Sequence, residues 1–182
     1  IWLGGAVFLV LQLVSRNLGF SRNLKRYSPI NDPKVTAILT DCASSMGISK
    51  SPPLIETPLV KTPALYGLFY PVLLFPFDQI HRFSNKELTH IFLHELAHLK
   101  RRDMATEWLM SLLCILHWFN PIIRFASRRM NTDRELACDE LVLSQSEQNE
   151  DQAYGDTIIK LLDKCSESKP LPGLICIIEN KQ

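Results

Sequence analysis

The feature that most constrains this chain is the pentapeptide His94-Glu95-Leu96-Ala97-His98. On a helix, residues four apart lie one turn apart on the same face, so both imidazoles can reach one metal ion. Glu95 lies about 100° around the same helix, where its carboxylate can touch a water molecule without binding the metal. This spacing is typical of zinc hydrolases, in which the metal polarises a carbonyl and the glutamate is the general base. It predicts a Zn²⁺ site with Glu95 as the catalytic base.

The sequence around the pentapeptide favours a helix. Ser84-Asn-Lys-Glu87 matches a capping box, which places a helix start about two turns before His94. An apolar stripe at three- and four-residue spacings follows, made of Leu88, Ile91, Phe92, Leu96 and Leu99. The alternative is that His94 and His98 are core histidines satisfied by hydrogen bonds. His90 extends the series by one turn and is interpreted as a neighbour of the site, because a third ligand there would strain tetrahedral geometry.

A hydrolytic zinc normally has three protein ligands and a water. Glu135 and Asp139 lie one turn apart in a helix expected from 126 to about 147. Glu135 can bind the metal, and Asp139 can accept the free N–H of His94 and so fix its tautomer. His117 and Cys138 compete for the place of third ligand, and the two acids could instead belong to an ordinary solvated helix face.

Composition limits the class of protein. A formal net charge of +1 gives no reason to expect direct nucleic-acid binding. The five cysteines are an odd number without C-x-x-C spacing, which argues against a disulfide framework and fits a reducing compartment.

The chain opens on an apolar run, from Ile1 to Val14, interrupted only by Gln12. Fourteen residues are too few to cross a bilayer, for which about 20 are needed. We therefore expect residues 1–20 to be part of a transmembrane helix, cut within the span. A basic flank without acids follows, made of Arg16, Arg22, Lys25 and Arg26, and it places this side in the cytoplasm. A core helix of a soluble protein is the alternative.

The middle of the chain changes from helix to strand character. A short helix is expected from Pro33, capped by Asp32, to a stop near Gly47. From 48 to 77, prolines separate short β-prone runs at 54–57, 59–60, 64–70 and 72–75, so these are expected as edge strands or with proline at strand ends. The segment centred on Gly67 is the candidate edge for holding an extended peptide by strand addition.

After the motif, Lys100 to Asp103 is interpreted as a solvated helix end. The hydrophobic segment 104–126 is expected as a buried or membrane-adjacent helix, kinked or broken near Pro121, since His, Asn and Pro within it are unfavourable in lipid. A further helix is expected from Tyr154 to Cys165, and a strand between 170 and 178. The expected fold is α+β: a mostly helical, zincin-like domain with a small proline-punctuated sheet, preceded by part of a transmembrane helix.

Three segments together resemble a known family. They are His94-Glu-Leu-Ala-His-Leu-Lys-Arg-Arg-Asp103, His117-Trp-Phe-Asn-Pro121 and Arg134-Glu-Leu-Ala-Cys-Asp-Glu140. In this order they are similar to the cytoplasmic zinc-peptidase (gluzincin) domain of the β-lactam sensor-transducer, or antirepressor, membrane proteins. The resemblance implies that His94, His98 and Glu135 bind zinc. It also implies that Glu95 is the base and that Asp139 orients a ligand.

The resemblance also implies a location and a role. Residues 21–182 would be the cytoplasmic domain of a multi-pass protein of the bacterial cell membrane that regulates antibiotic resistance. It would cleave its own receptor chain, a transcriptional repressor, or both, and the expected partners are that protein substrate, the membrane and a second copy in a homodimer. An additional oxyanion donor is expected, with His117, Arg134 and Tyr66 as unranked candidates.

Other functions fit parts of the same pattern. A membrane-protein quality-control or prenyl-protein peptidase has the same zinc motif and a downstream Glu-x-x-x-Asp. A non-catalytic signalling module would use zinc only to hold two helices together, but such a site needs no base. A small soluble protein without a metal is the third alternative.

Overall fold

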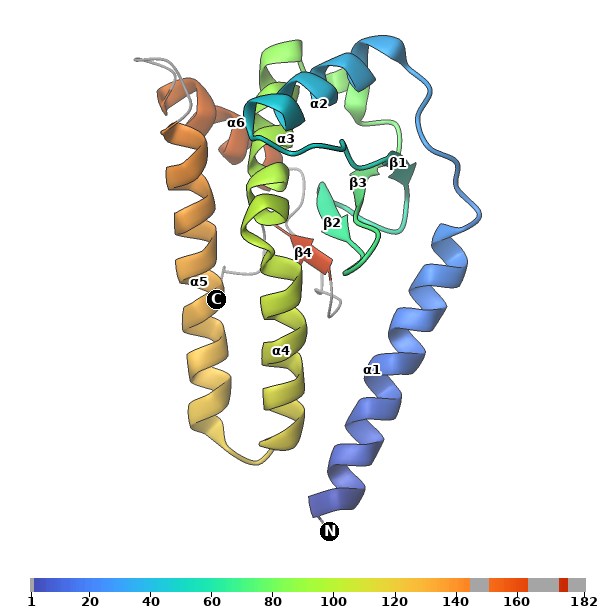
Figure 1. Ribbon diagram of the computed structural model, residues 1–182, viewed down its shortest axis with the longest axis vertical. Helices are drawn as coiled ribbons and strands as arrows, with labels where there is room; N and C mark the ends of the chain where they lie inside the picture. Colours follow the sequence, from blue (N-terminus) through green and yellow to red (C-terminus); the bar gives the residue numbers. More distant parts are fainter. Residues whose placement is uncertain (1, 145–150, 164–173, 177–182) are drawn as a thin grey trace.

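The computed structural model describes residues 2–144, 151–163 and 174–176, and Figure 1 shows their arrangement. A small sheet lies between the long N-terminal helix α1 (Trp2–Leu24) and a group of helices. That group contains α2 (Pro33–Ser45), α3 (Asn85–Arg101), α4 (Asp103–Leu116), α5 (Pro121–Leu143) and α6 (Asp151–Asp163). The expected α+β fold, mostly helical with a small sheet after an apolar helix, is confirmed.

The sheet has the strand order β1-β3-β2-β4. Its strands are β1 (Leu54–Thr57), β2 (Ala64–Tyr66), β3 (Val72–Pro76) and β4 (Leu174–Cys176). β1 pairs with β3 in parallel, and β2 pairs antiparallel with both β3 and β4. The short 3₁₀ helix η1 (Ile80–Arg82) leads from β3 towards α3.

Both faces of the sheet are covered, which explains why β3 is apolar throughout rather than alternating. Leu73 and Phe75 of β3 belong to the main core with α2 and α3, whereas Leu74 between them packs in a second cluster. That second cluster contains Phe20 and Leu24 from the end of α1. The sheet therefore joins the apolar N-terminal helix to the body of the domain.

The strands predicted at 54–57 and 72–75 are confirmed, whereas the predictions at 59–60 and 64–70 included residues that are not in strands. Residues 58–59 form a turn and Val60 lies outside any strand. The 64–70 run is a strand only as far as Tyr66, because the chain reverses at Gly67. Gly67 has φ +100°, and an added Cβ would lie 2.5 Å from the carbonyl oxygen of Tyr70, so only glycine fits this turn. The prolines stand beside or at the ends of strands, as expected.

Helix α3 begins as predicted. The Ser84 side chain accepts a hydrogen bond from the Glu87 backbone N–H, and the Glu87 carboxylate accepts one from the Ser84 backbone N–H. The helix ends at Arg101 and is capped by Arg102, whose left-handed conformation (φ 59°) turns the chain directly into α4. Asp103 is therefore the first residue of α4 and is buried. The prediction of a solvated helix end at Lys100 to Asp103 is wrong for Asp103.

The hydrophobic segment 104–126 is not one helix. α4 ends at Leu116, and α5 starts at Pro121 with the Asn120 side chain accepting a hydrogen bond from the Ile122 N–H. The predicted break near Pro121 is thus confirmed. α5 starts at this proline, five residues before the helix start expected at 126. α4 and α5 form a hairpin that extends away from the sheet (Figure 1).

Several apolar side chains of this hairpin are exposed, among them Leu109, Leu112, Phe119, Ile122 and Phe125. The buried alternative does not hold for these side chains, and membrane adjacency stays a prediction. The hairpin tip contacts α1: the Trp2 indole N–H donates to the Leu116 carbonyl at 2.9 Å. Trp118 lies against Gly5, where an added Cβ would be 3.0 Å from its ring.

Helix α1 runs to Leu24, four residues beyond the expected limit of 20, because Arg16 and Asn17 do not interrupt it. Its 23 residues are long and apolar enough to cross a membrane, and only 11% of its most apolar 18-residue window is buried. Length and composition thus mark it as a candidate span.

The C-terminal predictions are met where the structure describes the chain. α6 starts at Asp151, three residues earlier than expected, and is described to Asp163. β4 covers three residues of the strand predicted between 170 and 178. Three parts of these predictions lie outside the described residues: the rest of that run, Cys165, and residues 145–147 of the helix expected to reach 147.

Candidate metal centre

His94, His98 and Glu135 are brought together by α3 and α5. The Glu135 carboxylate lies 3.5 Å from Nε2 of His94 and 3.7 Å from Nε2 of His98. The two imidazoles stand one turn apart on α3, with ring centroids 5.0 Å apart. The three residues offer ligand atoms that all lie within 4.8 Å of one another.

These distances fit a zinc ion. In a tetrahedral site with bonds of 2.0–2.1 Å, neighbouring ligand atoms are about 3.3 Å apart. Both Nε2 atoms are buried and have no hydrogen-bond partner. A buried imidazole nitrogen without a partner carries a desolvation cost, which a metal bond would remove. The residues present therefore suit a metal held by the two histidines and Glu135.

The other nitrogen of His94 is held by two acceptors from different helices. Nδ1 lies 2.9 Å from the Tyr154 hydroxyl of α6 and 3.1 Å from the Asp139 carboxylate of α5. The Tyr154 hydroxyl itself donates to Asp139 at 2.6 Å. This arrangement favours the tautomer with hydrogen on Nδ1, which leaves Nε2 free to bind a metal. Asp139 stands where the sequence predicted.

His98 has its own acceptor, which the sequence analysis missed. Its Nδ1 lies 2.9 Å from the Asp103 carboxylate, whose side chain is only about 5% exposed. Asp103 reaches this place because the left-handed turn at Arg102 folds the start of α4 back onto α3. Arg101 also donates to Asp103, at 3.4 Å. Both motif histidines are thus oriented by a carboxylate at Nδ1.

Glu95 is completely buried beside these ligands. Burial raises its pKa to about 7, although the neighbouring His94 and His98 act to lower the pKa. The backbone of Leu65 in β2 also lowers this pKa, but neither carboxylate oxygen has a hydrogen bond of standard geometry. Glu95 is therefore free to interact with another group in the site.

The charges around the site favour a cation. Burial acts to lower the pKa of His94, but Asp139 and Glu135 outweigh it and raise the pKa to about 10. Burial acts to raise the pKa of Glu135, but His94 and His98 lower it to about 2. The acids thus stabilise positive charge at the point where the two Nε2 atoms converge, as a divalent metal requires.

Cys138, the competing third ligand, lies on the other side of His98. Its sulfur is 3.1 Å from Nδ1 of His98 and donates to Asp103 at 3.4 Å. His98, Asp103 and Cys138 are therefore close enough to form a second candidate metal group. However, the atoms of this group already bond to one another, and burial raises the pKa of the Cys138 thiol far above its ordinary value. The group around Glu135 is the better metal site.

Of the three candidates for an additional donor, His117 and Tyr66 lie away from the site, and Arg134 is already engaged with Glu107. His117 is exposed at the end of α4, with Nδ1 3.2 Å from the Leu113 carbonyl, and its place beside the hairpin tip excludes it as a third ligand too. Arg134 donates to Glu107 of α4 at 2.9 Å. The Tyr66 hydroxyl donates to the Asn17 carbonyl of α1 at 3.3 Å, on the side of the sheet that α1 covers.

Tyr154 and His90 complete the buried surroundings. Tyr154 had no signal in the sequence, because its role depends on how α6 packs against α3 and α5. His90 lies one turn before His94, with Nδ1 3.2 Å from the Thr157 hydroxyl, and is a neighbour of the site as expected.

The Gly67-centred segment is not a free sheet edge. β2 is paired on both sides, by β3 and by β4, with Leu65 opposite Ile175 in β4. The prediction of an open edge is therefore wrong for β2, because a later segment of the same chain occupies it. β4 lies antiparallel to the strand whose Leu65 backbone is next to Glu95.

Comparison with known proteins gives matches over the whole chain. The family described as BlaR1 peptidase M56 matches residues 1–181. The regulatory protein BlaR1 of Bacillus licheniformis is 30% identical over 160 residues, which are 88% of this chain and 26% of that protein.

Two staphylococcal proteins match a shorter part. The methicillin resistance mecR1 protein of Staphylococcus aureus is 31% identical over 101 residues, covering 56% of this chain and 17% of that protein. The regulatory protein BlaR1 of Staphylococcus aureus is 30% identical over 94 residues, 52% of this chain and 16% of that protein. The chain thus spans about a quarter or less of the length of these curated relatives.

Proposed function

The chain belongs to the BlaR1 peptidase M56 family, and from this premise we propose that it is a membrane-tethered zinc endopeptidase acting in transmembrane signalling. Its substrate is its own receptor chain, a transcriptional repressor, or both, and the domain after α1 faces the cytoplasm. One observation carries the proposal: His94, His98 and Glu135 converge with free ligand atoms beside the buried Glu95.

Each residue has a role in peptide hydrolysis. His94, His98 and Glu135 hold the metal, and Asp139, Tyr154 and Asp103 fix the two imidazoles from behind. Zn²⁺ bound there would supply a Lewis acid that polarises the peptide carbonyl and acidifies water. Glu95 takes the proton from the attacking water and passes it to the leaving amine. Its burial keeps bulk water away from this transfer.

The pairing of β4 supports the receptor's own chain as a substrate. Peptidases commonly hold a substrate as an extended strand added to a sheet edge. β4 is such a strand, antiparallel to β2, and its Ile175 pairs with the residue whose backbone lies beside Glu95. Neighbouring strands are about 4.8 Å apart, so the backbone of β4 lies within one strand spacing of Leu65. A segment of this chain can therefore reach the site in extended form.

The first experiment tests the metal site. Zinc content is measured by elemental analysis of the protein purified in detergent, for wild type and for Glu135→Ala, His98→Ala and Glu95→Ala. Near-stoichiometric zinc is expected in wild type and Glu95→Ala, with a sharp loss in Glu135→Ala and His98→Ala. Glu140→Ala is the matched control, because Glu140 is an exposed acid of the same helix. Zinc retained in Glu135→Ala would contradict Glu135 as a ligand.

A second measurement separates the peptidase from a non-catalytic zinc module. The zinc-loaded protein is incubated alone, and cuts in its own chain are mapped by mass spectrometry. Cleavage is expected in wild type and Glu140→Ala and absent in Glu95→Ala, although that variant binds zinc. Equal cleavage in Glu95→Ala and wild type would show that Glu95 is not the base.

A further inference from the structure

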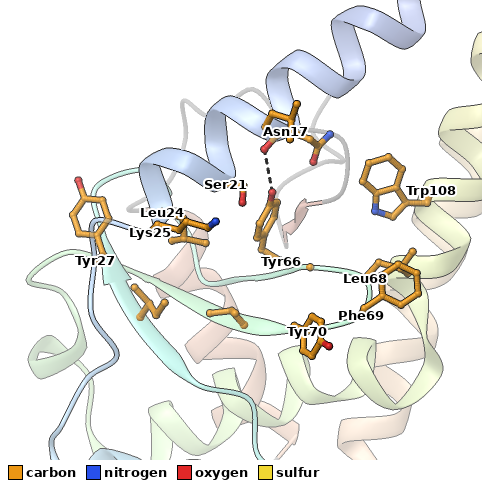
Figure 2. A pocket seen from close by; sticks show the side chains of 14 residues that line it. Asn17, Ser21, Leu24, Lys25, Tyr27, Tyr66, Leu68, Phe69, Tyr70 and Trp108 are labelled. Atoms are coloured by element: carbon orange, nitrogen blue, oxygen red, sulfur yellow. Dashed lines mark hydrogen bonds between the residues drawn. The ribbon is translucent and has the colours of Figure 1, made fainter.

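An apolar pocket of about 740 Å³ lies between the end of α1, the connection from β2 to β3, and α4. Figure 2 shows Asn17, Ser21 and Leu24 on the α1 side, Tyr66 in the centre, and Phe69, Tyr70 and Trp108 opposite. The volume falls within the range of about 300–1,000 Å³ of pockets that hold small organic ligands.

Aromatic side chains dominate this pocket. Three of the chain's four tyrosines line it, Tyr27, Tyr66 and Tyr70, together with Phe69 and Trp108. Phe69 and Tyr70 are 84% and 88% exposed, which is unusual for aromatic residues on a sheet connection. The connection is held in shape by Gly67, whose left-handed backbone brings the Tyr70 carbonyl close. The backbone that carries these exposed aromatic side chains is therefore fixed in shape.

The pocket lies at one end of the candidate membrane span. Its α1 residues come from 17 to 25, the last turns of the helix and the residue after it, and the exposed apolar residues of α1 lie mainly before them. If α1 crosses a bilayer, residues 17–25 lie at the boundary between the hydrocarbon core and the lipid headgroups. Tyrosine and tryptophan concentrate at that boundary in membrane proteins, because their rings are amphipathic.

Positive charge adjoins the same pocket. Arg22, Lys25 and Arg26 follow one another without an acid, and Lys25 is a lining residue. Among the residues that the structure describes, no carboxylate forms a salt bridge with any of these three. Figure 2 shows Lys25 beside Leu24, at the α1 wall of the pocket. An apolar cavity lined by Lys25, with Arg22 and Arg26 near it in the sequence, complements a ligand with an apolar chain and an anionic head.

We propose that this pocket binds an anionic phospholipid, with an acyl chain among the aromatic side chains and the phosphate at Lys25. An apolar polypeptide segment would also bury the aromatic residues, but it would bring no anion to Lys25 at the wall of the pocket. Tyr66 lines the pocket and is the last residue of β2. The residue before it, Leu65, has its backbone beside Glu95. The lipid would therefore contact the strand next to the metal centre.

The test uses the fluorescence of Trp108 in lipid nanodiscs. Trp2→Phe/Trp118→Phe leaves Trp108 as the only tryptophan. Nanodiscs contain phosphatidylcholine with a minor fraction of phosphatidylglycerol, and brominated acyl chains are placed on either lipid at the same total bromine content. We expect quenching to be several-fold stronger with bromine on phosphatidylglycerol. Equal quenching by the two lipids would overturn the preference for an anionic lipid, and no quenching by either would show that polypeptide or solvent fills the pocket.

Two pairs of variants in the same single-tryptophan background locate the effect. Lys25→Gln should remove the preference for phosphatidylglycerol, whereas Lys34→Gln, an identical change at an exposed residue of α2, should keep it. Ser21→Phe places a ring in the pocket and should reduce quenching, whereas Ser15→Phe on exposed α1 should not. Equal behaviour within either pair would overturn the proposal. Circular dichroism confirms folding, and lipid extracted from the purified wild type should be enriched in phosphatidylglycerol over the membrane from which it came.

Discussion

The metal centre buries polar side chains, whereas the outer end of the helical hairpin exposes apolar ones. Around the metal centre, His98 and Glu95 are 0% exposed although both are polar. At the outer end, Ile122 and Phe125 are 71% and 72% exposed although both are apolar. Water-soluble domains usually arrange these residue types the other way. Both regions are therefore energetically unfavourable by themselves.

The two regions differ in how far the structure relieves that cost. At the metal centre, Asp139, Tyr154 and Asp103 satisfy one nitrogen of each imidazole, and only the atoms that face the metal position are left without partners. At the outer end, nothing in the described residues covers the exposed rings of α5. A cation would relieve the cost in the first region, and an apolar environment such as a bilayer would relieve it in the second.

The largest expected effect separates two phenylalanines. Phe92→Ala removes a fully buried ring that contacts Phe75, and it should lower the free energy of unfolding by about 3–5 kcal/mol. Phe125→Ala should change it by no more than about 0.5 kcal/mol, because its ring is exposed. Chemical denaturation in detergent measures both. A large loss of stability in Phe125→Ala would show that its ring packs against protein.

A smaller effect is expected at the carboxylate behind His98. Asp103→Asn keeps the shape of the side chain but weakens the acceptor for Nδ1, so zinc affinity should fall by about 10–100-fold. Competition with a chromophoric chelator measures this affinity. Asp133→Asn is the control, because Asp133 is 55% exposed and pairs with Arg129 on the surface of α5. Unchanged affinity in Asp103→Asn would show that His98 is oriented by its helix alone.

The smallest effect concerns the ion pair that ties α6 to α3. Lys160 donates to Glu87 at 2.6 Å, and this hydrogen bond is the main cause that lowers the pKa of Glu87. A folded-state pKa below the unfolded value adds stability at neutral pH, which is lost as the pH falls through the folded value. Lys160→Gln should therefore cost up to about 1 kcal/mol at pH 7 and almost nothing well below pH 4.

Thermal unfolding at the two pH values checks this expectation. Lys34→Gln serves as the matched control, since Lys34 is an exposed lysine of α2. A difference between Lys160→Gln and wild type that persists at acid pH would mean that the lysine stem, not its charge, holds α6.

Local patterns in the sequence were enough for the parts of the structure that depend on neighbours along the chain. The capping box at Ser84, the metal-facing pair on α3 and the pairing of Glu135 with Asp139 all follow from helical spacing. The geometry of these residues is as expected, whereas their roles in metal binding and catalysis stay proposals. The strand starts at Leu54, Ala64 and Val72 follow from proline and glycine positions in the same way.

The parts that were missed depend on contacts between distant segments or on one backbone angle. Asp103 belongs to a charged run and reaches His98 only because Arg102 adopts a left-handed conformation, which arginine rarely does. Tyr154 needs α6 to cross α3, and no spacing encodes that packing. β4 pairs with a strand more than a hundred residues earlier, so the occupied edge of β2 had no local signal.

Helix α5 joins the two regions as a single rod. It carries Ile122 at its exposed start and Glu135 at the metal centre, 13 residues later, and so about 20 Å away. A tilt of about 3° at the exposed end displaces Glu135 by about 1 Å, and metal and catalytic sites tolerate about 0.5 Å. α5 would thus act as a lever arm: a tilt imposed at the hairpin tip would change the distance between Glu135 and the two imidazoles, without passing through the sheet.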